Sequence, residues 1–565
     1  MSKSILNQRY CYKLNSDYIK RNKDKVVIKD IKNAIKNRFI VGIGDSEGTR
    51  MIRNIINSKY TEDYINYIKY RIRQEKYNYD TENKIKFNLD EKIIEEIKDK
   101  DIKWLYNEKL IASVQEKLCN VVFKSDKDYD KYSKDGFYLN GEKYVLLLGT
   151  PGGIKANTVL FIAENIKSEI ERRIINGANL EIPTIPSKLM AYMALTFSAS
   201  TPLEFTDKIL VVKDVETSFE EDKIIHIKFD DDKEAPTVEE IENYKVINNA
   251  CDGCGLIRPS FADKWGANLK LDYTPTSFVI RNSWIKGVLT GFDFEEYANS
   301  RDDMKGKKVK DVWGKEWDLK DVDIILNESM FKLSKHYNSL EEYLSNCKEN
   351  GYGFSATKYV HDDIDNERML NYQYIQCLNL SDEDIDKLLT KDISEIKEIT
   401  GDNYIKSILF GRGKDLNDKN VWNIDDIESR HISALMVDKN CINDSHIKDR
   451  IRRTIHKRIN LLKTGKINVN GNYQIAIGEP VIQMESMFGL KPKGLLQSKE
   501  FYIEYWRNLN SDKVAGFRSP MSCKQNAKVM NVCNREEVVR WYSGLKNIIV
   551  FNGWDTAMSA FNGED

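Results

Sequence analysis

The spacing of hydrophobic and polar residues changes along the chain and divides it into four stretches. Between residues 90 and 118, apolar residues recur three and four positions apart with Lys and Glu between them, which is typical of amphipathic helices. Residues 144–162 instead hold two apolar runs around a glycine-rich turn, and residues 250–294 continue with strand-like runs punctuated by Gly and Pro. We therefore predict a helical head over residues 1–135 and a β-rich block over residues 136–300.

The second half of the chain repeats this order of helices before strands. Residues 447–463, IKDRIRRTIHKRINLLK, form a strongly basic helix candidate inside a stretch of helical character. Residues 466–482 and 546–555 return to the alternation and the apolar runs of strands. The sequence thus predicts a helical or mixed region over residues 301–464, a second β-rich block over residues 465–565, and an α+β class for the whole chain.

Composition narrows the class of protein. The 565 residues exceed what one hydrophobic core usually organises, and 41% hydrophobic with 31% charged residues is typical of folded globular proteins. The formal net charge of −1 neither favours nor excludes a nucleic-acid partner, because a basic channel can lie inside an acidic exterior. The N-terminus has no apolar signal core, and no apolar run approaches the roughly 20 residues that span a bilayer, so we expect no membrane partner.

The nine cysteines are scattered and odd in number, which favours a reducing compartment such as the cytoplasm over a disulfide framework. Cys251 and Cys254 form a lone CxxC pair. A structural zinc site needs two further ligands at suitable spacing, and none lies close by in the sequence. We interpret this pair as buried residues of a turn.

The glycine-rich turn GTPGGIK, residues 149–155, invites comparison with a phosphate-binding loop. Such a loop needs Gly-Lys-Ser/Thr at the start of a helix whose N-terminus faces the phosphates. Here Lys155 is followed by the strand-like run ANTVLFI, so the sequence offers no helix dipole. We predict a tight hairpin, from which Lys155 can still project into a site.

Two basic residues in the stretch IRNSWIKGV are candidates for binding phosphates. Arg281 and Lys286 are five positions apart, which in a regular strand places them on opposite faces of the sheet. A turn or bulge at Asn282 and Ser283 is needed to bring them together. Without that turn they are exposed edge charges, and the spacing alone favours this second interpretation.

The last residues of the chain are candidates for metal binding. Glu564 and Asp565 are hard oxygen ligands after an Asn-Gly turn. Carboxylates that converge in one loop can hold Mg²⁺ beside phosphates, whereas two acids at a chain end are usually a solvated tail. Arg518 lies upstream in a turn with Pro520. The pattern of residues leaves both interpretations of the acids open.

Four motifs, in the order DGCGLI, PTSFVIRNSWIKGVLTGFD, GFRSPM and AFNGED, resemble those of the double-psi β-barrel RNA polymerases. The likeness is to their single-chain branch, the YonO-like phage enzymes and the RNA-dependent RNA polymerases of eukaryotic RNA silencing. It covers residues 150–295 and 465–565. The resemblance implies a polymerase core with a first double-psi β-barrel within residues 136–300 and an incomplete second barrel within residues 465–565.

The resemblance also implies roles for individual residues. Lys286 matches the family's active-site lysine, Arg281 matches the arginine before it, and Arg518 matches the arginine of an Arg-x-Pro turn near the incoming nucleotide. Asp565 is at most the first of three aspartates that hold Mg²⁺, because the family pattern continues with Asp-Gly-Asp. Further candidates for binding nucleic acid or NTPs are Lys155, Lys264, Asn562, Arg452, Arg453 and Lys457, of which the last three can equally form the solvated face of a helix.

The function that the resemblance implies is Mg²⁺-dependent transfer of nucleotides from NTPs to the 3′ end of an RNA, copied from a nucleic-acid template. A DNA template is favoured because the run GGIKANT is closer in style to the phage enzymes, and an RNA template is the alternative. A phage enzyme of this kind works in the cytoplasm of a bacterial host.

The missing aspartates add further expectations. One Asp cannot hold two Mg²⁺ ions, so the chain alone is expected to be inactive. It is then a piece of a longer polymerase, one half of a polymerase whose second polypeptide carries the Asp-Gly-Asp loop, or an inactive relative that binds nucleic acid. A multidomain scaffold with chance motifs is the remaining alternative.

Overall fold

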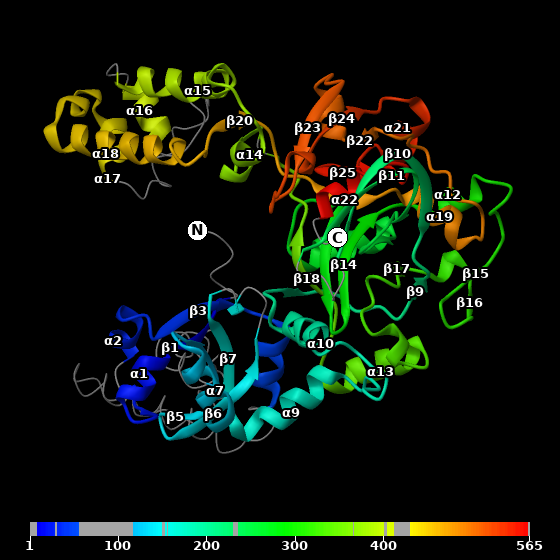
Figure 1. Cartoon of the computed structure of the whole chain (residues 1–565), viewed down its shortest axis with the longest axis horizontal. Helices are drawn as coiled ribbons and strands as arrows, with labels where there is room; N and C mark the ends of the chain where they lie inside the picture. The colour runs from blue at the N-terminus through cyan, green and yellow to red at the C-terminus, as the bar shows by residue number, and fades with distance from the viewer. Residues whose placement is uncertain are drawn as a thin grey trace, which may run out of the picture. The chain divides into compact units, whose positions relative to one another are not determined.

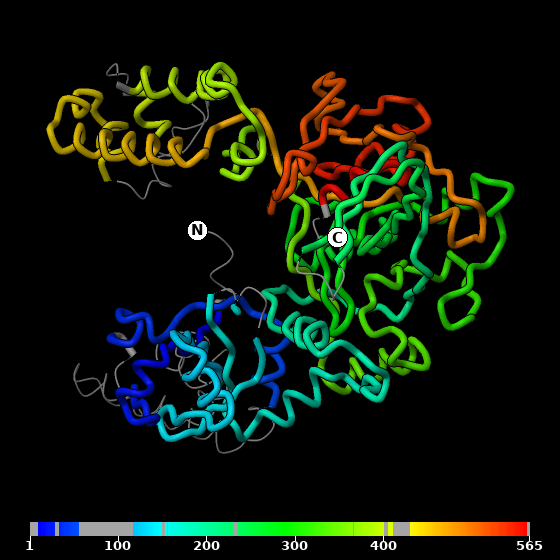
Figure 2. Tube along the Cα trace, viewed as in Figure 1, coloured from blue at the N-terminus to red at the C-terminus, as the bar shows by residue number. Residues whose placement is uncertain are grey.

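The computed structural model describes residues 8–28, 31–55, 117–149, 153–154, 156–229, 235–364, 366–400, 404–411 and 430–562. The chain forms two compact units, each assembled from segments that are distant in sequence (Figures 1 and 2). The first unit comprises Met1–Val215, Cys251–Val360 and Gln483–Pro492, and the second comprises Glu216–Ala250, His361–Ile482 and Lys493–Asp565.

Seven strands near the N-terminus form a mixed sheet in the spatial order β2-β5-β6-β7-β4-β1-β3. β1 pairs with β4 in parallel and with β3 in antiparallel orientation. The strands are β1 (Gln8–Asn15), β2 (Lys25–Val26), β3 (Ile40–Gly44), β4 (Leu118–Val122), β5 (Phe137–Leu139), β6 (Glu142–Leu148) and β7 (Thr158–Ala163). The helices are α1 (Ser16–Arg21), α2 (Ile31–Lys36), α7 (Asp126–Asp135) and α9 (Glu164–Ile175), and α9 buries Ile166, Ile170 and Ile174 on one face.

This sheet corrects the expected helical head over residues 1–135. The described residues of that range contribute β1 to β4, and β5 to β7 beyond residue 136 belong to the same sheet. The expected boundary therefore divides a single sheet. The helical pattern over residues 90–118 lies outside the described residues except at its end, where Leu118 begins β4.

A second mixed sheet of the first unit has the order β8-β18-β13-β14-β12-β17-β9. The pairs β12–β14 and β17–β9 are parallel, and the others are antiparallel. The strands are β8 (Thr201–Pro202), β9 (Ile209–Val212), β12 (Cys254–Ile257), β13 (Ser277–Asn282), β14 (Ile285–Gly291), β17 (Ile324–Asn327) and β18 (Ser355–Tyr359). β9, β12 and β17 are buried along their whole length, as continuous apolar runs such as ILVV predict.

Helices and short ribbons complete this part of the first unit. They are α10 (Pro186–Met193), α11 (Pro259–Asn268), α12 (Phe294–Asn299), α13 (Leu340–Asn350) and the ribbon of β15 (Val309–Lys310) and β16 (Glu316–Trp317). Trp265 of α11 is fully buried against Phe278 of β13 and Phe354, and its indole N–H donates to the Glu204 carbonyl at 3.0 Å. This ring fixes α11 on β13, which leads into the candidate site.

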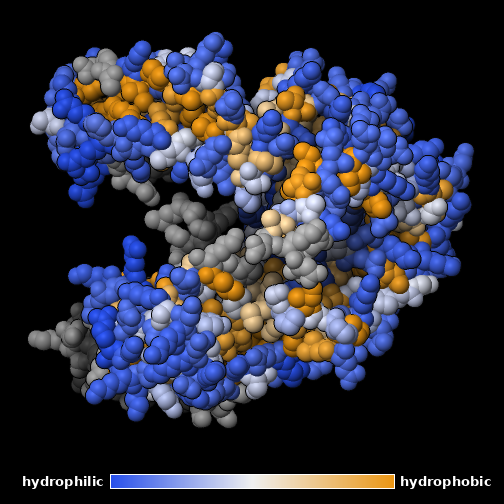
Figure 3. Space-filling view, viewed as in Figure 1, coloured by the Kyte–Doolittle hydropathy of each residue, from blue (hydrophilic) through white to orange (hydrophobic). Residues whose placement is uncertain are grey.

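The second unit contains a long hairpin, a helical region and a five-stranded sheet. The hairpin is β10 (Glu216–Lys228) with β11 (Thr237–Asn249). The helical region consists of β19 (Glu367–Met369), α14 (Tyr372–Cys377), α15 (Asp382–Thr400), α16 (Tyr404–Gly411), α17 (Arg430–Val437), α18 (Ser445–Leu462) and β20 (Asn468–Asn470). Apolar side chains gather on the surface over α15 and α16, where Ile393 and Ile405 are exposed (Figure 3).

The five-stranded sheet has the order β21-β25-β22-β24-β23. Its strands are β21 (Ile475–Gly478), β22 (Glu500–Tyr502), β23 (Lys513–Phe517), β24 (Ala527–Val532) and β25 (Ile548–Phe551). The accompanying helices are α20 (Glu504–Asn508), α21 (Glu536–Tyr542) and α22 (Ala557–Asn562). α19 (Pro480–Met487) follows β21, and its residues from Gln483 onward belong to the first unit. Phe501, Met530, Phe551 and Phe561 form a core that packs α22 against the sheet.

The predicted α+β class is confirmed, as are most of the predicted elements. Residues 144–162 contain most of β6 and β7, residues 250–294 contain β12 to β14, and residues 447–462 fall in α18. The expected start of the helical region at residue 301 is wrong, because β17 and β18 extend the second sheet to Tyr359. None of the helices in the described ranges is long and apolar enough to cross a membrane.

A buried ion pair holds the helical region together. Arg458 of α18 contacts the carboxylate of Asp392 on α15, and both side chains are almost fully buried. Asp392 also accepts a hydrogen bond of 2.9 Å from the Asn468 backbone N–H of β20. On the exposed side of α18, Arg453 pairs with Asp449 one turn earlier at 2.7 Å. The helix therefore carries one buried and one exposed ion pair.

We predict that Asp392→Ala destabilises the helical region by about 3–5 kcal/mol, because it leaves the Arg458 charge buried and uncompensated. The matched control Asp449→Ala breaks the exposed pair and costs only about 0.3–0.5 kcal/mol. Hydrogen exchange of peptides from α18 measures the local opening free energy in both variants. Equal effects of the two substitutions would show that the buried pair does not fix the helices.

Candidate active site

The motif IRNSWIKGV forms a tight hairpin that brings its two cations together. Arg281 of β13 and Lys286 of β14 are direct cross-strand partners, and the loop between the strands is Ser283–Trp284 with Ser283 in the left-handed region at φ +47°. Direct cross-strand partners lie on the same face of a sheet with their Cβ atoms about 4.5–5.5 Å apart. The interpretation of Arg281 and Lys286 as charges on opposite faces is therefore wrong, and the turn that joins them is present.

The hairpin turn is anchored from inside the protein. Trp284 is fully buried, and its indole N–H donates to the Tyr337 hydroxyl at 2.9 Å and the Ile175 carbonyl at 3.2 Å. The Tyr343 hydroxyl donates to the Asn282 carbonyl at 2.6 Å. The position of the turn, and so the pairing of the two cations, is fixed by contacts at its buried end.

The DGCGLI motif lies directly beside this hairpin. β12 pairs with β14 in parallel, and the Val288 N–H donates to the Gly253 carbonyl at 2.8 Å. A Cβ atom at Gly287 would lie 2.6 Å from the same carbonyl, so only glycine allows this approach next to Lys286. Cys251 and Cys254 are buried around the turn, as expected, and Asn327 donates to the carbonyls of both.

Arg281 is fixed, whereas Lys286 is exposed. The Arg281 Nη1 donates to the Ile280 carbonyl at 2.7 Å, and its Nε is buried without a hydrogen-bond partner in the described part of the chain. Burial lowers the pKa of Arg281, and the charge of Glu47 acts in the opposite direction. Lys286 projects from β14 as an exposed side chain. The hairpin thus presents one exposed and one immobilised cation on one face.

Glu47 is a buried carboxyl near Arg281 that no sequence pattern pointed to. It is 4% exposed, and within the described residues neither carboxylate oxygen has a hydrogen bond of normal geometry, although the Ser283 backbone lies nearby. Burial raises its pKa from 4.5 to about 7, and the charges of Arg50 and Arg281 limit that rise. Glu47 is therefore a proton-binding group beside the hairpin.

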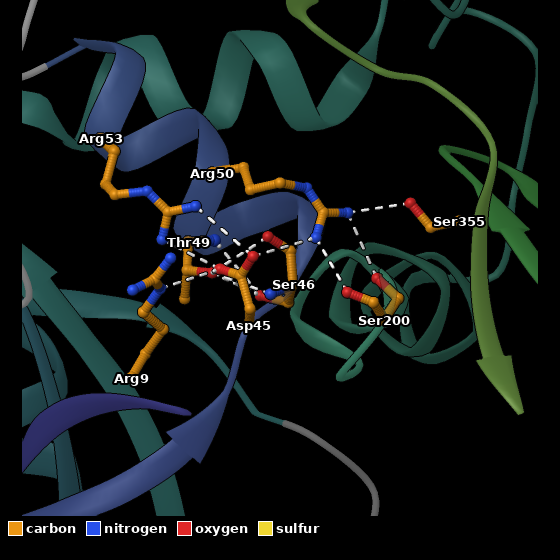
Figure 4. A network of polar contacts seen from close by, with 8 residues as sticks. All are labelled: Arg9, Asp45, Ser46, Thr49, Arg50, Arg53, Ser200 and Ser355. Carbon is orange, nitrogen blue, oxygen red and sulfur yellow. Dashed lines mark hydrogen bonds and ion pairs between the residues drawn. The ribbon is translucent and has the colours of Figure 1, made fainter. Parts of the chain in front are cut away.

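The stretch GDSEGTRMIR, residues 44–53, also builds a network around Asp45 (Figure 4). Asp45 accepts from Thr49 Oγ1 at 2.8 Å, and three guanidinium groups reach its carboxylate: Arg53 Nη1 at 2.9 Å, Arg9 Nε at 3.3 Å and Arg50 Nη1 at 3.5 Å. Burial opposes its ionisation, but Arg53 and Thr49 hold the pKa of Asp45 below its usual range.

Arg50 connects this network to the second sheet. Its Nη1 donates to the Ser200 carbonyl at 3.0 Å and its Nη2 to Ser355 Oγ at 2.9 Å. Ser355 of β18 is the cross-strand partner of Arg281. Two features of the sequence could have pointed to this network. They are the Ser46-x-x-Thr49 pattern of a helix start and the arginines three positions apart on the following helix.

In the second unit, Arg518 is held against the end of α22. Its Nη1 donates to the Phe561 carbonyl at 2.8 Å, and Asn526 Nδ2 donates to the Ala560 carbonyl at 2.8 Å. The predicted turn at Arg518 therefore contacts the segment that leads toward Asp565. Asp565 itself and the side chain of Asn562 lie outside the described residues, as does Lys155.

The remaining candidates are surface residues of other elements. Lys264 of α11 is exposed, 4.0 Å from a Glu204 oxygen and 5.5 Å from the centre of the Phe261 ring. These contacts do not join it to Arg281 or Lys286. The other candidates, on the exposed side of α18, are Arg452, Arg453 and Lys457.

The described residues do not fit a magnesium site. Across residues 8–562, leaving aside the gaps in the description, no three Asp, Glu, His or Cys side chains gather closely enough to hold a metal ion. The carboxylate of Asp45 is paired with arginines, and Glu47 is buried with a raised pKa, so neither offers an ionised carboxylate for a metal ion. We therefore assign no chemical step to a metal bound by these residues.

Comparison with known proteins finds a family model, a curated relative and a solved structure that are similar to this chain. A family model described as RNA dependent RNA polymerase matches residues 71–478. The DNA-directed RNA polymerase YonO of Bacillus phage SPbeta is 28% identical over 419 residues, which are 72% of this chain and 46% of YonO. Among solved structures, the RNA dependent RNA polymerase QDE-1 from Thielavia terrestris aligns with a TM-score of 0.49 and 14% identity, over 78% of this chain and 46% of QDE-1. The chain spans about half the length of these relatives.

We predict that Glu47→Gln makes the stability of the protein less dependent on pH. A carboxyl whose pKa rises from 4.5 to about 7 on folding stabilises most when protonated, and this contribution is lost as the pH rises from about 4.5 to 7. The uncharged amide avoids the loss, so the variant should match wild type at pH 4, below the unfolded-state pKa, and exceed it at pH 8 by up to about 3 kcal/mol.

Urea unfolding at the two pH values measures the difference. The neighbouring groups Tyr343, Cys347 and Tyr352 have raised pKa values and remain neutral over this range. Glu296→Gln, at an exposed carboxyl of α12, is the control and should show the same difference from wild type at both pH values. A Glu47→Gln variant that is destabilised more at pH 8 would mean that Glu47 is ionised and paired with Arg281.

Proposed function

The chain belongs to the RNA dependent RNA polymerase family, and on this premise we propose that it acts in RNA synthesis, transferring nucleotides from NTPs to the 3′ end of an RNA. The observation that carries the proposal is the pairing of Arg281 with Lys286 on one face of an anchored hairpin. Transfer of a nucleotide develops negative charge on phosphate oxygens, and positioned cations stabilise that charge.

The two hairpin cations suit different parts of this task. The exposed ammonium group of Lys286 can follow a phosphate as its geometry changes, because a lysine side chain is long and flexible. The guanidinium group of Arg281 is held by the Ile280 carbonyl and offers a fixed direction for a phosphate oxygen. We propose that Lys286 contacts the reacting phosphates and that Arg281 binds the nucleotide beside it.

Arg518 is proposed as a third cation of the same chemistry. Its hydrogen bond to the Phe561 carbonyl ties it to the segment that precedes Asp565. We propose that Mg²⁺ supplies the remaining charge stabilisation in this transfer, with Asp565 as one ligand. The roles proposed for the three cations rest on their own contacts and not on the geometry of a bound metal.

We propose DNA as the template, because the relative with 28% identity is named a DNA-directed RNA polymerase. The family description names RNA as the template, so RNA is the second candidate. The chain aligns with 46% of YonO. This match gives no support to a second polypeptide that carries the Asp-Gly-Asp loop. For a relative of a phage enzyme, we propose the cytoplasm of a bacterial host as the location.

We predict that Lys286→Met lowers RNA synthesis by about 100-fold, which is typical for loss of one group that stabilises transition-state charge. The assay supplies NTPs and Mg²⁺ with single-stranded DNA or RNA of the same sequence, and the better template decides between the two candidates. Lys310→Met, at an exposed lysine of β15 paired with Glu316, is the control and should retain activity.

If the protein makes no RNA with either template, a measurement of NTP binding tests the role of Lys286. Equilibrium dialysis with labelled NTP then compares wild type with Lys286→Met, and about tenfold weaker binding by the variant, or about 1.4 kcal/mol, is expected. Unchanged synthesis and unchanged NTP binding in Lys286→Met would remove this lysine from the proposal.

We also propose that the exposed side of α18 contacts the phosphates of the template or product. Arg452, Arg453 and Lys457 are exposed there, and the buried Arg458–Asp392 pair fixes the helix from the other side. Arg453 is already paired with Asp449, so the charges of Arg452 and Lys457 are the better test. Contacts between basic side chains and phosphates do not distinguish nucleotide sequences, and they weaken as the salt concentration rises.

We predict that the double variant Arg452→Gln, Lys457→Gln binds single-stranded oligonucleotides more weakly, by a similar factor for every sequence. The slope of log affinity against log salt should become shallower by about 0.7 per lost contact. Fluorescence anisotropy over a salt series measures both quantities. Lys387→Gln, on α15 in an exposed pair with Glu383, is the matched control. An unchanged slope in the double variant would show that this side of α18 is only a solvated surface.

A further inference from the structure

The arginines around Asp45 carry more positive charge than the carboxylate can balance. Arg9, Arg50 and Arg53 all reach Asp45, whose side chain is 10% exposed (Figure 4). Arg50 has other partners, because it donates to Ser200 and Ser355 and lies within the field of Glu47. Arg9 and Arg53 therefore share a single carboxylate.

These two arginines converge on the same atom from different elements. Arg9 Nε and Arg53 Nη1 both donate to Asp45 Oδ1, at 3.3 and 2.9 Å, from β1 and from the helix over residues 47–55. Arg53 Nη2 also donates to Asp45 Oδ2 at 3.5 Å. Their side chains are 21% and 18% exposed, so solvent reaches part of each. Within the described residues the two Nη groups of Arg9 make no hydrogen bond, which leaves donors for a ligand.

Two guanidinium groups held this close repel each other, and partial burial reduces the screening by water. The effect is visible at Arg50, where burial and the charge of Arg53 both lower the pKa. One carboxylate offsets only one of the two charges of Arg9 and Arg53. An anion bound between them would offset the other and use the unpaired donors of Arg9.

We infer that Arg9 and Arg53, positioned by Asp45, form a binding site for a phosphate group of a nucleic-acid strand or of a nucleotide. The fork of Arg9 can donate two parallel hydrogen bonds to phosphate oxygens, and Arg53, whose two Nη groups contact Asp45, adds a second positive charge beside it. The site belongs to the same unit as the hairpin, and Arg50 links it through Ser355 to the strand beside Arg281. It is separate from the cations proposed for catalysis and does not depend on their roles.

Chemical footprinting of arginines by phenylglyoxal tests the inference directly. The full chain is modified alone, with single-stranded DNA, with single-stranded RNA and with ATP, and the extent at each arginine is read by mass spectrometry. We expect protection of Arg9 and Arg53 but not of Arg172, an exposed arginine of α9 that pairs with Glu169. Protection by an oligonucleotide alone assigns a strand phosphate, and protection by ATP alone assigns a nucleotide. Failure of all three ligands to protect would overturn the inference.

Substitutions separate a binding role from a structural one. Arg9→Gln should weaken binding of the protecting ligand about tenfold. Arg9→Lys keeps the positive charge but loses the forked guanidinium group, so its affinity should lie between those of Arg9→Gln and wild type. Arg172→Gln is the control. A melting temperature lowered by Arg9→Gln with unchanged affinity would make the cluster purely structural. Because Lys286 is intact in these variants, their result is independent of the test of catalysis.

Discussion

The burial of Trp284 is the constraint on which the candidate site depends. Its indole ring fills the turn between β13 and β14 and is hydrogen-bonded to Tyr337 and to the end of α9. A shift of the strand register by one residue would move every side chain to the other face of the sheet. The buried turn prevents such a shift, so Arg281 and Lys286 remain opposite each other. The exposed Lys286 is thus positioned by a neighbouring turn residue that is itself buried.

Two of the cations proposed for catalysis are held by backbone carbonyls. Arg281 donates to the Ile280 carbonyl and Arg518 to the Phe561 carbonyl, whereas Arg50 donates to the Ser200 carbonyl and also contacts the Asp45 carboxylate. A carbonyl fixes the direction of a guanidinium group without cancelling its charge, as a carboxylate partner would. Groups that stabilise developing charge work best when they are oriented before the reaction begins. An arginine held by a backbone carbonyl therefore keeps more of its positive charge for a phosphate than an arginine in a surface ion pair does.

Local patterns predicted the local structure of this chain well, and long-range pairing much less well. The apolar run YVLLL and the basic helix at residues 447–463 were recognisable because each carries its own periodicity. The strand pairing of β1 with β4 joins residues more than one hundred positions apart, and β1 itself holds only three buried apolar side chains among polar ones. No short window of the sequence contains that information, and the local pattern of the N-terminal region therefore predicts helices. The hairpin at Arg281 was decided by the turn Ser283–Trp284, whose bulky Trp is not a usual turn residue.

Two carboxyl groups that no sequence pattern singled out show that the surroundings of a group decide its pKa. Asp45 and Glu47 are two positions apart in the stretch GDSEGTR, and arginines lie near both. Hydrogen bonds from Arg53 and Thr49 lower the pKa of Asp45, while burial raises that of Glu47 to about 7. One carboxyl is thus firmly ionised and the other gains a proton near neutral pH. Because protonation of Glu47 removes a negative charge beside Arg50 and Arg281, this part of the protein becomes more cationic as the pH falls. Its attraction for phosphates should strengthen in the same direction.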